Sequence, residues 1–125
     1  MPSSVSEKMK LIRAMRPMLS AEQRFWPKVQ LSSQDGCWLW TGAVTAAGYG
    51  MFGRGKRGEG NFYAHRFSFT LHGGVLTPDK ELDHLCRNRS CVNPAHLELV
   101  TRRTNHLRGN HPSAIRYRQR GGLVP

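Results

Sequence analysis

The most informative segment of the chain spans residues 82–110 and reads LDHLCRNRSCVNPAHLELVTRRTNHLRGN. Within it Cys86, Cys91 and His96 follow the spacing C-x4-C-x4-H. One loop with this spacing can present two thiolates and an imidazole to a single Zn²⁺, which favours sulfur and nitrogen ligands. We therefore interpret the segment as a metal-binding loop rather than as a stretch with ordinary buried thiols.

A closed structural zinc site needs a fourth ligand. Cys37 is the remaining one of three cysteines, and its thiolate would complete a Cys3His tetrahedron. His72, His106 and His111 are weaker candidates for the same position. Because an odd number of cysteines cannot all pair within one chain, a disulfide framework is disfavoured, and the thiolates fit a reducing, cytoplasmic compartment.

Residues on both sides of this loop carry donors of a different kind. Asp83 and His84 directly precede it. After it, the apolar run 97–100 predicts a second strand, and Thr101 is suited to N-cap a final helix that carries Asn105 one turn in. The order strand, loop, strand, helix would return Asn105 to the strand that bears His84.

The upstream half predicts short elements joined by turns around one modest core, since only 38% of the 125 residues are hydrophobic. Ser20 and Gln23 fit a capping box, and Phe25 and Trp26 are expected in the core. The patterns predict helices at 21–26 and 64–72 and strands at 37–41 and 48–52. A further amphipathic helix, ended by Pro17, is expected from Val5, Met9, Ile12 and Met15.

The charge of the chain indicates a polyanionic partner. The formal net charge is +11 and the pI is about 10.6. Basic side chains gather in residues 1–28, 54–66 and 101–125, an arrangement suited to a phosphate backbone. We expect double-stranded DNA to contact Arg54, Lys56, Arg57, Arg102, Arg103 and Arg108. No window approaches the roughly 20 apolar residues of a membrane span, so no membrane partner is expected.

The run from Asp83 to Asn105 resembles the HNH endonucleases of the ββα-metal superfamily, in particular the small phage-type proteins. Its cysteine and histidine spacing is similar to that of the His-Cys box homing endonucleases. The resemblance extends upstream through 25–26, 37–42 and 64–66. It implies an α+β fold, a small zinc-stabilised ββα-metal nuclease domain with short antiparallel strands and flanking helices. The implied parts are an N-terminal helical arm at 1–23, the nuclease domain at 24–110 and a basic tail at 111–125.

The resemblance also implies hydrolysis of DNA phosphodiester bonds with a catalytic Mg²⁺ or Mn²⁺. His84 matches the general base, and Asp83 and Asn105 match the ligands of the catalytic metal. Arg66 and His65 are expected near the scissile phosphate, although Arg66 fits an exposed or salt-bridged arginine equally well. The structural zinc set is matched by Cys37, Cys86, Cys91 and His96. Because His96 occupies the position where many HNH proteins carry the central asparagine, the letters H-N-H do not map simply onto this chain.

Two other functions stay open from the residues alone. One is a zinc-dependent nucleic-acid-binding module without catalysis, in which Asp83, His84 and Asn105 are incidental surface residues. The other is a basic structural or packaging-accessory protein. Cleavage of one or both strands, a monomer or a homodimer, and roles in homing, restriction or phage-genome processing are equally compatible with the sequence.

Overall fold

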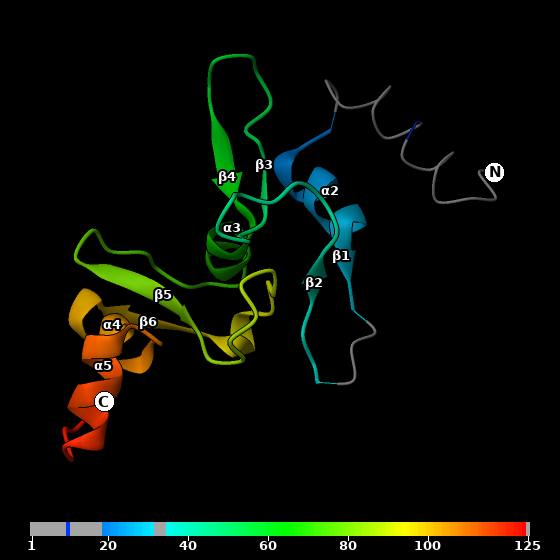
Figure 1. Ribbon diagram of the computed structural model, residues 1–125. Helices are drawn as coiled ribbons and strands as arrows, with labels where there is room; N and C mark the ends of the chain where they lie inside the picture. The colour runs from blue at the N-terminus through cyan, green and yellow to red at the C-terminus, as the bar shows by residue number, and fades with distance from the viewer. Residues whose placement is uncertain (1–9, 11–18, 32–34, 125) are drawn as a thin grey trace.

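The computed structural model of the protein describes residues 10, 19–31 and 35–124 (Figure 1). The helix expected from Val5, Met9, Ile12 and Met15 lies outside these residues. In chain order the elements are α2 (Ala21–Phe25), η2 (Trp26–Lys28), β1 (Val29–Gln30), β2 (Leu39–Trp40), β3 (Met51–Gly53), β4 (Asn61–Tyr63), α3 (Ala64–Leu71), β5 (Lys80–His84), η3 (Pro94–His96), β6 (Leu97–Thr101), α4 (Arg102–Arg108) and α5 (Pro112–Gln119).

Local signals explain where the helices begin and end. The Ser20 hydroxyl and the Gln23 side chain form the expected capping box at the start of α2. The Thr101 hydroxyl accepts from the backbone N–H of Thr104 and so caps α4, as predicted. After α3 the chain turns through Gly73, whose φ of 93° lies in the left-handed region that favours glycine.

The strands form three antiparallel pairs, β1 with β2, β3 with β4, and β5 with β6. The α+β class expected from the sequence, with short antiparallel strands and flanking helices, is confirmed. The largest pair joins β5 to β6, with Asp83 opposite Glu98 and His84 opposite Leu97. Figure 1 shows α4 and α5 beside this pair, whereas the loop between β3 and β4 projects away from the rest of the molecule.

The core is an aromatic cluster between α2, β2, β3 and α3. Phe25 is fully buried and stacks on Trp40 with ring centroids 5.5 Å apart. Phe52 and Val92 complete the buried cluster with Ala64, and Trp26 packs against it as expected. Val92 belongs to the segment between β5 and β6, and its carbonyl accepts a 2.5 Å hydrogen bond from Ser68 on α3. The core therefore fixes this segment against α3.

Two of the expected strands are placed differently. The strand expected at 37–41 is limited to Leu39–Trp40, and the one expected at 48–52 is Met51–Gly53. The strands β1 and β4 were not predicted, because two or three residues carry too little periodicity to be recognised. Among the described helices, none is long and apolar enough to cross a membrane.

The segment expected as a basic tail contains helix α5, which packs on α4. Ala114 is fully buried. The guanidinium of Arg118 donates to the carbonyl oxygens of Leu107 and Gly109, which end α4. Arg103 of α4 lies over the ring of Tyr117 at 5.7 Å. Since these contacts join α5 to the helix that carries Asn105, α5 is an integral part of the described fold.

Candidate metal and catalytic sites

The four residues expected to bind zinc come together at one point. The ligand atoms of Cys37, Cys86, Cys91 and His96 all lie within 4.8 Å of one another. His96 Nδ1 is 3.5 Å from the sulfur of Cys37 and 3.5 Å from that of Cys91. Zinc at ideal tetrahedral bond lengths separates sulfur from nitrogen ligands by about 3.6 Å. The Cys3His cluster therefore fits a structural zinc.

The electrostatics of the sulfurs agree with this fit. Burial raises the pKa of Cys37, and the neighbouring Cys91 and Cys86 raise it further. Burial also raises the pKa of Cys91. Crowded, buried sulfurs are poorly stabilised as thiolates by the protein alone, whereas a divalent cation of the zinc type stabilises them directly.

The weaker zinc candidates have other partners. His72 Nδ1 lies 2.7 Å from the carbonyl oxygen of Ser68, and its ring packs edge-on against Trp26 and Trp38. His106 and His111 both bond the hydroxyl of Ser113. Cys37 is therefore the fourth member of the cluster, and it links the segment before β2 to the loop between β5 and β6.

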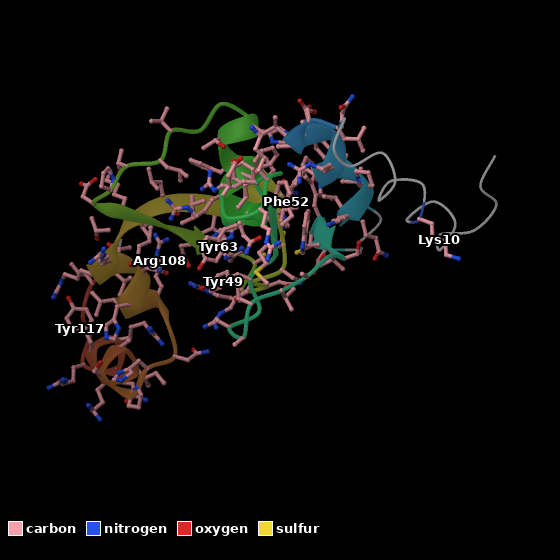
Figure 2. All side chains as sticks on the ribbon, turned by 90° about the horizontal axis from the view of Figure 1, so that it is seen from above. Lys10, Tyr49, Phe52, Tyr63, Arg108 and Tyr117 are labelled. Carbon is pink, nitrogen blue, oxygen red and sulfur yellow. The ribbon has the colours of Figure 1, made fainter. Side chains whose placement is uncertain are left out.

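Next to this cluster, β5 and α4 line a cleft of about 560 Å³. Its lining includes three of the four residues expected to take part in catalysis, namely Asp83, His84 and Asn105. Figure 2 shows Tyr49 and Arg108, which also line the cleft, in the same region of the molecule although they come from distant parts of the chain. The predicted return of Asn105 to the strand that bears His84 is thus observed.

His84 is buried at the end of β5. Its ring is held by the backbone of the loop between β5 and β6, residues 85–96, which we call the zinc loop. Its Nε2 lies 3.0 Å from the carbonyl oxygen of Cys91. A carbonyl oxygen only accepts, so Nε2 is the protonated nitrogen of the neutral ring and Nδ1 keeps its lone pair. Burial lowers the pKa of His84 despite the raising effects of this bond and of Asp83.

Asp83 is 4% exposed and is paired with two arginines. Arg87 donates to Oδ1 and Arg108 to Oδ2, each at 3.0 Å. Arg108 also reaches Glu98 on β6 at 3.2 Å. The backbone of Arg87 has a φ of 63°, a left-handed conformation that few residues other than glycine adopt. The zinc loop therefore holds Arg87 in an unusual turn beside the carboxylate.

Asn105 is oriented by an acidic side chain of β5. Its Nδ2 donates a 2.7 Å hydrogen bond to Glu81 Oε2, and Arg102 approaches the other oxygen of Glu81 at 3.4 Å. Glu81 and Asp83 are two residues apart on β5, so they lie on the same face of the strand. The cleft thus combines carboxylate and amide oxygens, the hard ligands that Mg²⁺ prefers, with an imidazole.

A second histidine, His65, packs against His84. The two ring centroids are 4.9 Å apart, and Tyr49 stacks on His65 at 5.2 Å. His65 is 7% exposed, and its Nδ1 is buried without a hydrogen-bond partner. Burial, followed by the charges of His84 and Arg66, lowers the pKa of His65 to about 3. His65 is therefore a neutral, aromatic neighbour of His84 at any working pH.

Arg66 does not join the cleft. It is exposed on α3 and lines a different hollow, together with Arg54, Tyr63 and Phe67. Of the pair that the sequence placed near the scissile phosphate, the structure brings His65 rather than Arg66 to His84, because neighbouring residues on a helix point in different directions.

The residues expected to contact DNA divide into two groups. Arg54, Lys56 and Arg57 are exposed on the projecting β3–β4 loop, and Arg102 and Arg103 are exposed at the start of α4. Arg108 instead points into the cleft, where 15% of its side chain is exposed and it pairs with Asp83.

Several cleft residues were missed by sequence reasoning. Glu81 could have been found from strand alternation, since it stands two residues before Asp83. Arg87 and Arg89 lie in the zinc loop, and Arg89 covers the ring of Tyr49 at 5.4 Å. Tyr49 itself carries no local signal, because it reaches the cleft only through the packing of the turn before β3.

Comparison with known proteins agrees with this geometry. Residues 62–107 match a family model described as HNH endonuclease. The matched segment is similar to the HNH endonucleases. It contains α3, β5, β6 and nearly all of α4, and therefore includes Asp83, His84 and Asn105. It also contains three of the four residues of the zinc cluster, whereas Cys37 lies upstream of it.

Two phage proteins are similar to the chain beyond this motif. The "Uncharacterized gene 5.3 protein" of Enterobacteria phage T3 is 34% identical over 59 residues, which cover 46% of this chain and 58% of that protein. "Protein 2.8" of Escherichia phage T7 is 29% identical over 87 residues, covering 70% of this chain and 58% of that protein. The matches thus span little more than half of each relative. No solved structure matches the chain.

Proposed function

We propose that the chain is a metal-dependent DNA endonuclease or nickase in which His84 is the general base. The observation that carries this proposal is the bond from His84 Nε2 to the carbonyl oxygen of Cys91 at 3.0 Å. It assigns the ring proton to Nε2 and leaves Nδ1 to accept a proton from an attacking water. The match of residues 62–107 to HNH endonucleases supports the same reaction class.

The other residues of the cleft have complementary roles in this proposal. Asp83 and Asn105 would hold Mg²⁺ or Mn²⁺ through carboxylate and amide oxygens. When bound, such an ion neutralises the charge that builds on the phosphate and assists the departing 3′ oxygen. His65 and Tyr49 cover the His84 ring and restrict its motion and its access to bulk water. The zinc cluster has a structural role, since four protein ligands leave no open position.

Double-stranded DNA is the proposed substrate. The exposed basic residues of the β3–β4 loop and of α4 and α5 are charged at neutral pH and face solvent. HNH proteins act on DNA, and the net charge of +11 favours association with its backbone. The basic residues would position the duplex, while the cleft would perform the chemistry.

The test is metal-dependent cleavage of supercoiled plasmid by the zinc-loaded chain. We expect nicked or linear product with Mg²⁺ or Mn²⁺ and none with EDTA, scored before zinc is lost. A His84→Ala variant that binds DNA and zinc normally should cut at least about 100-fold more slowly. If the wild-type chain binds plasmid but leaves it intact with either ion, the alternative of a zinc-dependent nucleic-acid-binding module replaces the nuclease.

A further inference from the structure

Glu81 is placed to decide which atom of Asn105 faces the cleft. The Asn105 side chain ends in an oxygen and a nitrogen of nearly the same size, and only the oxygen can ligate a cation. An ionised carboxylate accepts hydrogen bonds and cannot donate them. The 2.7 Å contact with Glu81 Oε2 therefore requires the NH2 of Asn105 to face Glu81.

The positions of Glu81 and Asn105 in the fold bring their side chains together. Glu81 lies on β5 opposite Val100, at the end of the hairpin where β6 leads into α4. Asn105 lies one turn into α4, whose start is fixed by the Thr101 cap. Arg102 holds the second oxygen of Glu81 at 3.4 Å, so the carboxylate is held from both sides.

We propose that Glu81 is a positioning residue that locks the Asn105 amide with Oδ1 turned toward the metal-binding part of the cleft. This inference rests on the proposed function, in which Asn105 is a metal ligand. Without Glu81 the amide can rotate and present its NH2, which cannot bind a cation. Partners that orient a ligand in this way typically contribute about 10- to 100-fold to metal affinity or activity.

The experiment measures Mn²⁺ affinity by electron paramagnetic resonance or calorimetry on zinc-loaded protein that also carries His84→Ala, so that cleavage plays no part. We expect Glu81→Ala to weaken Mn²⁺ binding at least about tenfold, with zinc content and thermal stability retained. Glu98→Ala is the matched control. It removes a carboxylate from the neighbouring strand, next to the Asp83 pair, and should change Mn²⁺ affinity little.

A double-mutant cycle with Asn105→Ala separates the possible roles of Glu81. If Glu81 acts through Asn105, Glu81→Ala adds no further loss in the Asn105→Ala background. A further loss there would show that Glu81 binds the cation itself and would overturn the positioning role. An unchanged affinity of Glu81→Ala alone would also overturn it.

The cycle also separates two hypotheses, the positioning role of Glu81 and the role of Asn105 as a metal ligand. If Asn105→Ala leaves Mn²⁺ affinity unchanged, the assignment of Asn105 as a ligand fails, and the inference fails with it. If Asn105→Ala weakens binding but Glu81→Ala does not, only the inference fails. In the protein with His84 intact, raising Mg²⁺ should restore cleavage by Glu81→Ala, because its defect lies in metal binding rather than in the chemical step.

Discussion

His84 Nε2 lies 3.0 Å from the carbonyl oxygen of Cys91, so one residue of the zinc loop serves two sites. The Cys91 sulfur belongs to the Cys3His cluster, while its carbonyl holds the imidazole of the proposed base. The orientation of His84 consequently depends on a loop whose Cys3His cluster fits a zinc ion. Loss of zinc should therefore impair cleavage even though zinc takes no part in the reaction.

The first prediction concerns Cys37, which ties a distant segment to the zinc loop. We expect about one zinc per wild-type chain and clearly less in Cys37→Ser, because three ligands leave the tetrahedron open. A loss of about 3 kcal/mol would lower the melting temperature by more than about 10 °C in a domain of this size. Metal analysis and thermal unfolding check both values. His72→Ala, outside the cluster, is the control and should keep its zinc.

The second prediction concerns the chemical step. His84→Ala should retain fold, zinc and DNA binding but cleave at least about 100-fold more slowly in saturating Mg²⁺, since general-base catalysis contributes about 10²- to 10⁴-fold. Initial rates of plasmid nicking provide the measurement. His111→Ala, an exposed histidine outside the cleft, should cut at the wild-type rate. Equal rates for His84→Ala and wild type would remove His84 from the mechanism.

The third prediction concerns acid stability. The pKa of His65 falls from an ordinary value of 6.5 to about 3 on folding. As pH falls, His65 is therefore protonated in the unfolded chain before it is protonated in the folded chain. Its contribution to the free energy of unfolding is fully present above pH 6.5 and is lost as pH falls toward 3. Between these values His65 contributes a slope of up to about 1.4 kcal/mol per pH unit.

Denaturant unfolding between pH 5 and 7 tests this slope. His65→Phe should show a shallower dependence than wild type, while zinc release affects both proteins alike. His111, which is exposed, serves as the control. His111→Ala should keep the wild-type dependence of the unfolding free energy on pH. Parallel curves for His65→Phe and wild type would mean that His65 titrates normally in the folded chain.

The fourth prediction concerns the C-terminal helix. Arg116 is exposed on α5 and Arg120 is exposed directly after it, whereas Arg118 is engaged with the end of α4. If the first two contact phosphates, Arg116→Gln with Arg120→Gln should reduce the salt slope of DNA binding by about 2, since each contact contributes about 0.9. Fluorescence anisotropy over a salt series measures the slope.

Lys80→Gln removes one charge outside the three basic segments and should leave that slope nearly unchanged. Point substitutions are preferable to removal of residues 111–125, because Ala114 is buried and Arg118 bonds α4. A double variant whose slope equals that of wild type would show that α5 does not touch the DNA backbone.

The sequence was most predictive where spacing and chemistry coincide. The zinc loop, the cap at Thr101 and the return of Asn105 to the strand of His84 follow from local patterns, and all three are found in the fold. The placement of Cys37 was also predicted, although only by its being the remaining cysteine.

The parts that were missed depend on packing between distant segments. The approach of His65 and Tyr49 to His84 follows from how α3 packs on the segment before β6, which no local pattern encodes. Helix α5 was taken for a tail because its basic residues, such as Arg116, outweigh its apolar ones. What secures α5 is one buried alanine and the contacts of Arg118 with carbonyls of α4.

The register of β5 against β6 has a consequence for how the chain can fold. A slip by one residue in such a ladder would turn each side chain to the opposite face, moving Asp83 away from α4. Cys86 and Cys91 lie between the two strands, and His96 lies directly before β6. One ion bound by all three would therefore fix how many residues separate the paired ends of β5 and β6. We therefore expect bound zinc to favour the observed register of β5 against β6, and we expect chains that fold without zinc to be free to pair one residue out of alignment.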